Sequence, residues 1–152
     1  MTTKPAIVLD ANVVAKAFLD EEYSDNSIAI ITDSVADGLP LFAPFHFQSE
    51  VVNTIHKHRL QRNISSEEAD QALTRFLQLQ INLVSSPELY QRGFAFAHEH
   101  GLTTIYDSMY AVLAESLNAE FWTNDLRFIR QVGQSASWIR WLGDYESQTR
   151  IE

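Results

Sequence analysis

The sequence contains no cysteine, few glycines and prolines, and little positive charge. The lack of cysteine excludes disulfides, thiolate metal ligands and cysteine nucleophiles. The five glycines and four prolines are spread thinly, and no repeat, low-complexity tract or linker separates two halves. We therefore expect a single domain over residues 1–152.

Long apolar runs are also missing. No stretch of about 18 apolar residues is present, which excludes a transmembrane helix. The first ten residues lead into an apolar run without the apolar core of a signal peptide. The expectation from both observations is a cytoplasmic protein.

Negative charge dominates the chain. The 11 lysines and arginines stand against 20 aspartates and glutamates, which gives a net charge of −9. This balance argues against a protein that coats nucleic acid through a basic face. It is compatible with an enzyme that holds a cation among carboxylates and meets a phosphate through that cation. Solubility alone is the other explanation.

Short apolar runs alternate with longer amphipathic segments. The short runs are typical of buried strands and cover residues 6–9, 39–44, 81–84, 119–123 and 137–142. The amphipathic segments predict helices over about 12–22, 25–37, 45–60, 65–79, 86–100, 107–117 and 126–131. Such alternation favours right-handed βαβ units. The predicted fold class is α/β, a three-layer α/β/α arrangement with a short, mostly parallel central sheet.

Several helix boundaries have local signals. Ser65 with Glu68 three residues later is the signature of a capping box. Ser24 or Asp25 is expected to cap the helix that Gly38 ends.

Four acidic residues occupy positions where this fold would bring them together. Asp10 and Asp125 each follow a strand-like run, so in neighbouring parallel strands both would lie at the carboxyl edge of the sheet. Asp107 stands at the expected start of a helix, and Glu50 lies in a helix beside apolar residues. Taken singly, each acid is also explained as a turn, cap or surface residue.

Together, however, these carboxylates would repel one another and raise one another's pKa unless a cation neutralised them. Oxygen-only ligands suit Mg²⁺ or Mn²⁺. A site of this kind would polarise a phosphate and activate water for its hydrolysis.

Four segments carry a family likeness: VLDANVV (8–14), SEVVN (49–53), IYDSMYAVLAE (105–115) and FWTND (121–125). In their order and wide spacing they resemble the PIN-domain ribonucleases, and within these the VapC-type toxins of toxin–antitoxin pairs. Asn124, where many relatives have a small residue, is a mild departure. The resemblance implies a PIN-like fold for the whole chain.

The resemblance also implies the chemistry. It assigns Asp10, Glu50, Asp107 and Asp125 as the acidic quartet that binds Mg²⁺ or Mn²⁺ and cleaves RNA phosphodiester bonds. Two small polar residues that match family positions would support the site, namely Asn12 and Thr123. A cognate antitoxin and a homodimer are implied partners. The alternative is a catalytically inactive PIN-fold module that binds RNA or a protein partner, which the intact quartet disfavours.

The densest basic stretch follows Glu50 on the same predicted helix. Its Lys57 and Arg59, with Arg62 beyond, are candidates for contact with an RNA backbone. Basic residues at a helix C-terminus also favour the helix dipole and need no ligand. Lys16, Arg127 and Arg130 lie within a turn or two of Asp10 and Asp125 and would add positive charge near the acids.

Other patterns point to structure or to no particular chemistry. The tryptophans fall in strand-like runs, so core packing explains them better than base stacking. The apolar stripes of helices 12–22 and 25–37 are explained mainly by core burial and partly by a homodimer or antitoxin face.

Neither a Gly-rich phosphate loop nor a G-x-S-x-G motif is present. A phosphatase is disfavoured because Asn12 replaces the second acid of Asp-x-Asp. Of the five histidines, His46 stays a minor candidate because it precedes Glu50.

Overall fold

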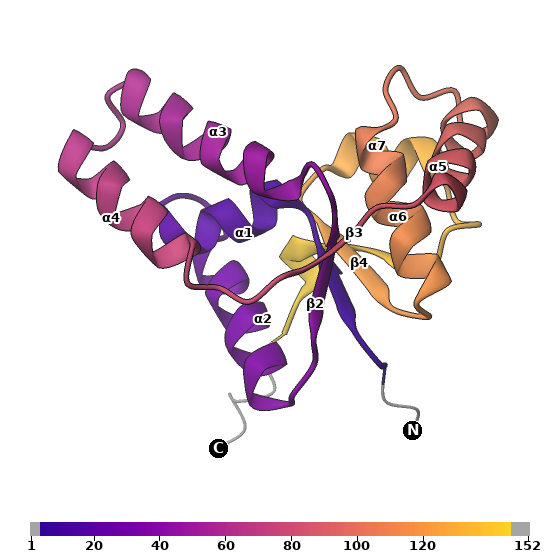
Figure 1. The fold of residues 1–152 in the computed structure, drawn as a ribbon, viewed down its shortest axis with the longest axis horizontal. Coiled ribbons are helices and arrows are strands. Elements are labelled where there is room, and N and C mark those ends of the chain that lie inside the picture. Colours follow the sequence, from indigo (N-terminus) through magenta and orange to yellow (C-terminus); the bar gives the residue numbers. More distant parts are fainter. Residues whose placement is uncertain (1–3, 147–152) are drawn as a thin grey trace.

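A computed structural model describes residues 4–146 of the chain (Figure 1). Its strands are β1 (Ile7–Leu9), β2 (Leu41–Pro44), β3 (Asn82–Val84), β4 (Glu120–Thr123) and β5 (Ile139–Trp141). Its helices are α1 (Ala11–Phe18), α2 (Ser24–Ala36), α3 (Phe47–Leu60), α4 (Ser66–Phe76), α5 (Pro87–Glu99), α6 (Tyr106–Ser116) and α7 (Leu126–Val132), with a 3₁₀ turn η1 (Leu142–Asp144).

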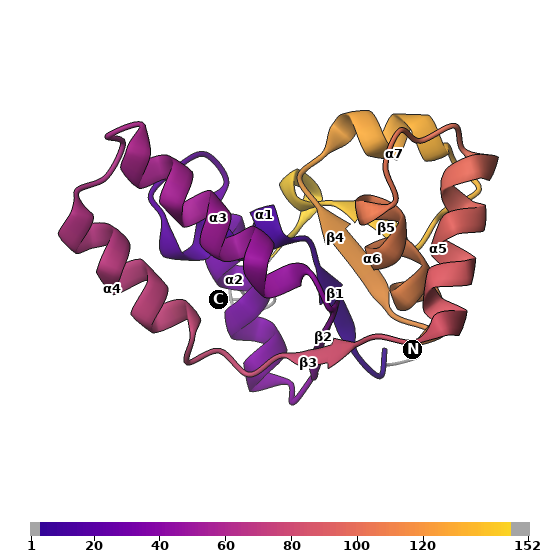
Figure 2. The same cartoon turned by 45° about the horizontal axis from the view of Figure 1, so that its top comes forward.

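The strands form one sheet in the order β3-β2-β1-β4-β5, and every neighbouring pair is parallel. Helices α1 to α4 lie on one side of the sheet and α5 to α7 on the other, as Figure 2 shows. The three-layer α/β/α expectation is therefore confirmed. Among the described residues no helix is long and apolar enough to cross a membrane.

The core lies between the sheet and the helices. Val8 and Phe121 at the sheet centre are inaccessible to solvent, as are Val13 on α1 and Phe47 on α3. On the other side α6 packs directly against β1, β2 and β4, and α5 packs on α6. The burial of β1 on both faces explains its unbroken apolar sequence, Ile7–Leu9.

The order of the strands identifies the edge of the sheet at which a ligand is expected to bind. From β1 the chain moves outward through β2 to β3, then returns to β4 on the other flank of β1. The direction of winding therefore reverses between β1 and β4. In open parallel sheets ligands bind beyond the carboxyl ends of the strands at such a switch point. Helices α1, α3 and α7 all begin at this edge (Figure 1).

Local signals in the sequence set several boundaries as expected. The Ser65 hydroxyl accepts from the Glu68 backbone N–H at 3.0 Å, and the Glu68 carboxylate accepts from the Ser65 N–H at 2.8 Å, a complete capping box. Gly38 follows α2 at φ +68°, a left-handed conformation that glycine adopts without steric cost.

Some boundaries differ from the prediction, among them the end of α4 at Phe76 instead of about Leu79 and the segment between α1 and α2. Helix α1 ends at Phe18, because Leu19 is extended and its carbonyl accepts from the Ser24 hydroxyl at 2.7 Å. Ser24 is the first residue of α2 rather than its cap. The N-cap is Tyr23, at φ +67° and without a side-chain cap, so neither Ser24 nor Asp25 caps this helix as expected.

Candidate functional site

Asp10 lies at the carboxyl end of β1 and caps α1. It is 6% exposed, and its Oδ1 accepts from the Asn12 backbone N–H at 3.3 Å. The Thr123 hydroxyl, at the end of neighbouring β4, donates to Asp10 Oδ2 at 2.8 Å. Burial nevertheless outweighs these hydrogen bonds, and together with the charges of Glu50 and Asp125 it raises the Asp10 pKa to about 6.

Asp125 is held beside Asp10 by the same hydroxyl. Its backbone N–H donates to Thr123 Oγ1 at 3.1 Å, so this oxygen accepts from Asp125 while donating to Asp10. The Asp125 carboxylate in turn accepts from the Phe128 N–H at 3.0 Å and caps α7. One threonine therefore links the two strand-end acids across β1 and β4.

Glu50 is fixed from two other elements. It lies in the first turn of α3, and its Oε1 accepts a 2.6 Å hydrogen bond from the hydroxyl of Tyr110, a fully buried residue of α6. His46 Nε2 lies 3.5 Å from the same oxygen. Burial raises the Glu50 pKa, against the effect of the Tyr110 hydrogen bond. Burial also lowers the His46 pKa, which favours its neutral form.

Asp107 stands in the first turn of α6 and is half-buried. Burial, followed by the charges of Asp10, Asp125 and Glu50, raises its pKa to about 7. All four acids thus lie within electrostatic range of one another at the carboxyl edge of the sheet. At neutral pH the cluster carries unneutralised negative charge, which a bound cation would compensate.

The donor set fits a hard divalent cation, because all four side chains offer carboxylate oxygen. Among residues 4–146, however, no group of three or more acidic, histidine or cysteine side chains is arranged closely enough to hold a metal ion.

The supporting residues named from the sequence lie in different settings. Thr123 is buried and bonded to Asp10 as described above, whereas Asn12 is exposed and contacts Asp10 through its backbone N–H. Lys57, Arg59 and Arg62 are exposed at or beyond the far end of α3, away from Glu50 in its first turn.

Lys16 does not bring free positive charge to the acids. It is buried, and its ammonium pairs with Glu21 at 2.9 Å. The imidazole of His58, on α3, lies 3.4 Å from the other carboxylate oxygen of Glu21. The charge of Lys16 is therefore balanced within the fold.

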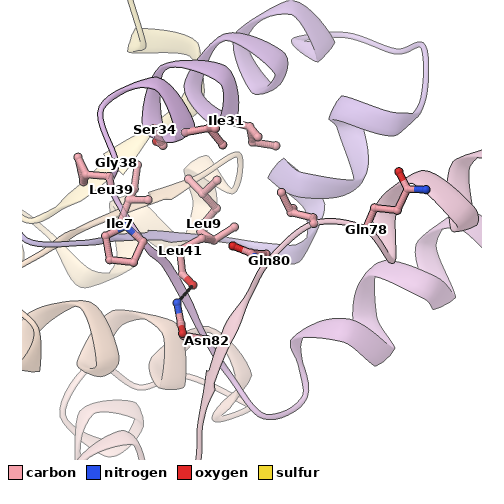
Figure 3. A pocket seen from close by; sticks show the side chains of 13 residues that line it. Ile7, Leu9, Ile31, Ser34, Gly38, Leu39, Leu41, Gln78, Gln80 and Asn82 are labelled. Carbon is pink, nitrogen blue, oxygen red and sulfur yellow. Dashed lines mark hydrogen bonds between the residues drawn. The ribbon is translucent and has the colours of Figure 1, made fainter.

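A cavity of about 560 Å³ lies away from the four acids (Figure 3). It adjoins the first residues of β1, β2 and β3 and the end of α2, and one wall carries a 3.2 Å hydrogen bond from Asn82 to the Leu41 carbonyl. Its lining contains no titratable side chain. Acid–base or metal chemistry therefore belongs to the acidic edge and not to this cavity.

Comparison with known proteins identifies the family. The family model described as PIN domain matches residues 7–133. The chain belongs to the PIN domain family. This agrees with the four segments that suggested it and with the confirmed α/β fold.

Relatives within this PIN family are distant in sequence. Ribonuclease VapC3 of Pyrobaculum aerophilum is 26% identical over 121 residues, covering 78% of this chain and 88% of the relative. Ribonuclease VapC12 of Mycobacterium tuberculosis is 29% identical over 99 residues, covering 65% of this chain and 74% of the relative.

Solved structures share the PIN fold. The crystal structure of PAE2754 from Pyrobaculum aerophilum superposes with a TM-score of 0.58 at 20% identity, covering 91% of both chains. That of FitAcB from Neisseria gonorrhoeae gives 0.56 at 15% identity, covering 89% of this chain and 95% of the other. At these identities the likeness concerns the fold alone.

Sequence reasoning missed Tyr110 as a site residue. Its signal was its position three residues after Asp107 in an expected helix, which places both on one side of that helix. His46 was singled out only for preceding Glu50, and its contact with the Glu50 carboxylate depends on how the turn before α3 folds.

Proposed function

We propose that this chain is a divalent-metal-dependent endoribonuclease that hydrolyses RNA phosphodiester bonds, and that it is the toxin of a toxin–antitoxin pair. The observation that carries the proposal is the convergence of four carboxylates, those of Asp10, Glu50, Asp107 and Asp125, at the switch point of a PIN fold. Relatives at low identity that are named ribonucleases support the activity.

In this proposal Asp10, Glu50, Asp107 and Asp125 hold Mg²⁺ or Mn²⁺. When bound, the ion supplies neutralising charge, polarises the scissile phosphate and lowers the pKa of water. The remaining residues orient the ligands: Thr123 holds the Asp10 carboxylate and Tyr110 holds that of Glu50. Such outer hydrogen bonds fix ligand geometry in metal sites.

The proposed partners follow from the same family. They are an RNA substrate, a cognate antitoxin protein and a second copy of the chain. In the same proposal, residues 1–152 form one domain that acts in the cytoplasm. Lys57, Arg59 and Arg62 are proposed contacts for the RNA backbone, supported by their exposure near one end of α3. The apolar side chains Ile28 and Val35 on α2, exposed at 47% and 69%, are available to a protein partner.

One observation favours the alternative of an inactive PIN-fold module. The acids of the described residues do not form a closed set of metal ligands. An inactive module would keep the fold while neither Mn²⁺ nor Mg²⁺ promoted RNA cleavage.

The deciding experiment is incubation of the purified chain with mixed RNAs in Mn²⁺ or Mg²⁺, beside an EDTA sample and the variant Asp107→Asn. We expect cleavage by the wild type, none in EDTA, and at least about a 100-fold lower rate in the variant, because a metal ligand is lost. Cleavage that survives Asp107→Asn would contradict the assignment of this site. No cleavage by the wild type in either metal would favour the inactive module.

A further inference from the structure

A smaller recess opens directly beside the acids. Its volume is about 230 Å³, and it is lined by the loop before α6, by Asp107 and Asp125, and by three residues of α7, namely Arg127, Phe128 and Gln131. Pockets for whole small ligands usually measure about 300–1,000 Å³. This recess is therefore suited to part of a nucleotide rather than to a complete small molecule.

The wall of the recess is fixed by hydrogen bonds within the protein. The Gln131 side-chain amide on α7 donates to the carbonyls of His100 at 3.2 Å and Gly101 at 2.8 Å. The Leu102 N–H donates to the Ala97 carbonyl at 2.8 Å, a hydrogen bond that follows the end of α5. The loop that carries Thr103 and Thr104 is thus held against α7 before any ligand binds, which lowers the entropic cost of binding.

Besides the Gln131 amide, which donates within the protein, three lining side chains carry hydrogen-bond donors, namely those of Thr103, Thr104 and Arg127. All three residues are exposed, and within residues 4–146 none of these side chains makes a hydrogen bond or ion pair. Arg127 stays unpaired although two carboxylates, Asp107 and Asp125, line the same recess.

The chemistry of these donors matches a phosphate. Guanidinium and hydroxyl groups are common partners of backbone phosphates in nucleic acids, and the guanidinium adds a charge-assisted hydrogen bond. Arg127 is also the only cation in this lining, so it offsets the repulsion between the acids and an approaching polyanion. A ligand phosphate here lies next to two of the four acids.

We propose that Arg127, together with Thr103 and Thr104, binds a backbone phosphate of single-stranded RNA adjacent to the phosphodiester that is cleaved. This inference rests on the proposed ribonuclease function and adds a substrate-positioning site to it. It gives the RNA strand a place on the α7 side of the acids, distinct from the basic end of α3.

The test compares Arg127→Gln and Arg127→Lys with the control Arg130→Gln. Arg130 lies on the same helix, is exposed, and does not line the recess. The probe is a fluorescein-labelled single-stranded RNA of mixed sequence, titrated in EDTA at several KCl concentrations and followed by anisotropy. Melting temperatures confirm that each variant is folded.

We expect Arg127→Gln to weaken RNA binding by about five- to tenfold and to reduce the slope of log K against log[KCl] by about 0.7, the loss of one phosphate contact. Arg127→Lys should keep the slope, and Arg130→Gln should bind like the wild type. In Mn²⁺, KM for cleavage should rise by a similar factor while kcat stays within about twofold, because the contact is made equally in the ground and transition states.

Unchanged binding by Arg127→Gln, or an equal loss in Arg130→Gln, would overturn the inference. If the wild type cleaves RNA and Arg127→Gln matches it in KM, only the phosphate site is rejected. If the wild type neither binds nor cleaves RNA, the ribonuclease proposal itself fails, and the phosphate site fails with it.

Discussion

Thr123 shows how one side chain organises the candidate site. Its hydroxyl donates to the Asp10 carboxylate and accepts from the Asp125 N–H. It is 1% exposed, so water cannot readily replace it. The orientation of Asp10 therefore depends on a residue of a different strand.

Replacing Thr123 by Val, which has nearly the same shape, removes this donor. We expect Thr123→Val to lower the free energy of unfolding by about 1–3 kcal/mol at pH 8, because a buried carboxylate loses its partner. Thr123→Ser keeps the hydroxyl and serves as the matched control. The measurement is urea denaturation in EDTA, and equal losses in both variants would contradict the role of the hydroxyl.

The raised pKa values of Asp10 and Asp107 predict how stability depends on pH without metal. Both carboxyls bind protons more tightly in the folded state, with pKa values of about 6 and about 7 against 3.8 when unperturbed. Their stabilising contribution is complete below about pH 4 and is lost as pH rises through the folded pKa values.

In EDTA we therefore expect the contribution of Asp107 to fall by on the order of 2 kcal/mol between pH 4 and pH 8, about half of what the full pKa shift gives, because solvent screens this half-buried carboxylate. Asp107→Asn should flatten the curve of unfolding free energy against pH, and Asp70→Asn, at an exposed position of α4, controls for the loss of a surface charge. A curve of the same steepness in wild type and Asp107→Asn would show that Asp107 is not perturbed in this way.

At the scale of elements, α6 has two tasks in the site. It carries Asp107 in its first turn and Tyr110 one turn later, and Tyr110 reaches across to Glu50 on α3. The helix also packs on β1, β2 and β4, so it cannot shift without disturbing the core. This packing ties the position of Glu50 to the sheet that positions Asp10 and Asp125.

Helix α4 offers a contrasting element, whose stability rests on a local motif. We expect Ser65→Ala to lower the free energy of unfolding by about 1 kcal/mol, because it breaks the capping box with Glu68. Ser66→Ala, the next residue and inside the helix, is the control and should cost little. Chemical denaturation measures both, and equal losses in the two variants would contradict the role of the capping box.

In the whole molecule, the four candidate ligand acids lie at the point where the winding of the sheet reverses between β1 and β4. Asp10 and Asp125 follow adjacent strands, while Glu50 and Asp107 arrive on helices from opposite sides of the sheet. The repulsion among them is a cost to the metal-free fold, since burial and mutual charge raise the pKa of Asp10 and Asp107. A cation bound there would remove that cost.

Mn²⁺ should therefore stabilise the folded chain. At a concentration 100 times the Kd, binding adds about 2.7 kcal/mol to the free energy of unfolding. We expect the melting temperature to rise on adding Mn²⁺ to the wild type and to rise much less in Asp107→Asn. An equal rise in both proteins would place the ion elsewhere.

The sequence by itself determined the order and type of the elements, because strong local signals agreed with the fold. A short apolar run such as the one before Asp10 is typical of a strand that is buried on both faces of a sheet. The Ser65–Glu68 capping box is a local signal for the start of a helix. The same patterns indicated Asp10, Glu50, Asp107 and Asp125 as candidate ligands, since parallel strands end at one edge.

Tertiary structure decided the contacts that no local pattern encodes. The end of α1 at Phe18 depends on a hydrogen bond from Ser24 five residues beyond Leu19. The links from Thr123 to Asp10 and from Tyr110 to Glu50 join residues 113 and 60 positions apart. Lys16, promising as a cation near the acids, became buried against Glu21, whereas Arg127 came to line the recess beside Asp107 without a partner of its own. Such pairings depend on how the strands and helices meet in space, because side-chain hydrogen bonds and ion pairs act only over a few ångströms.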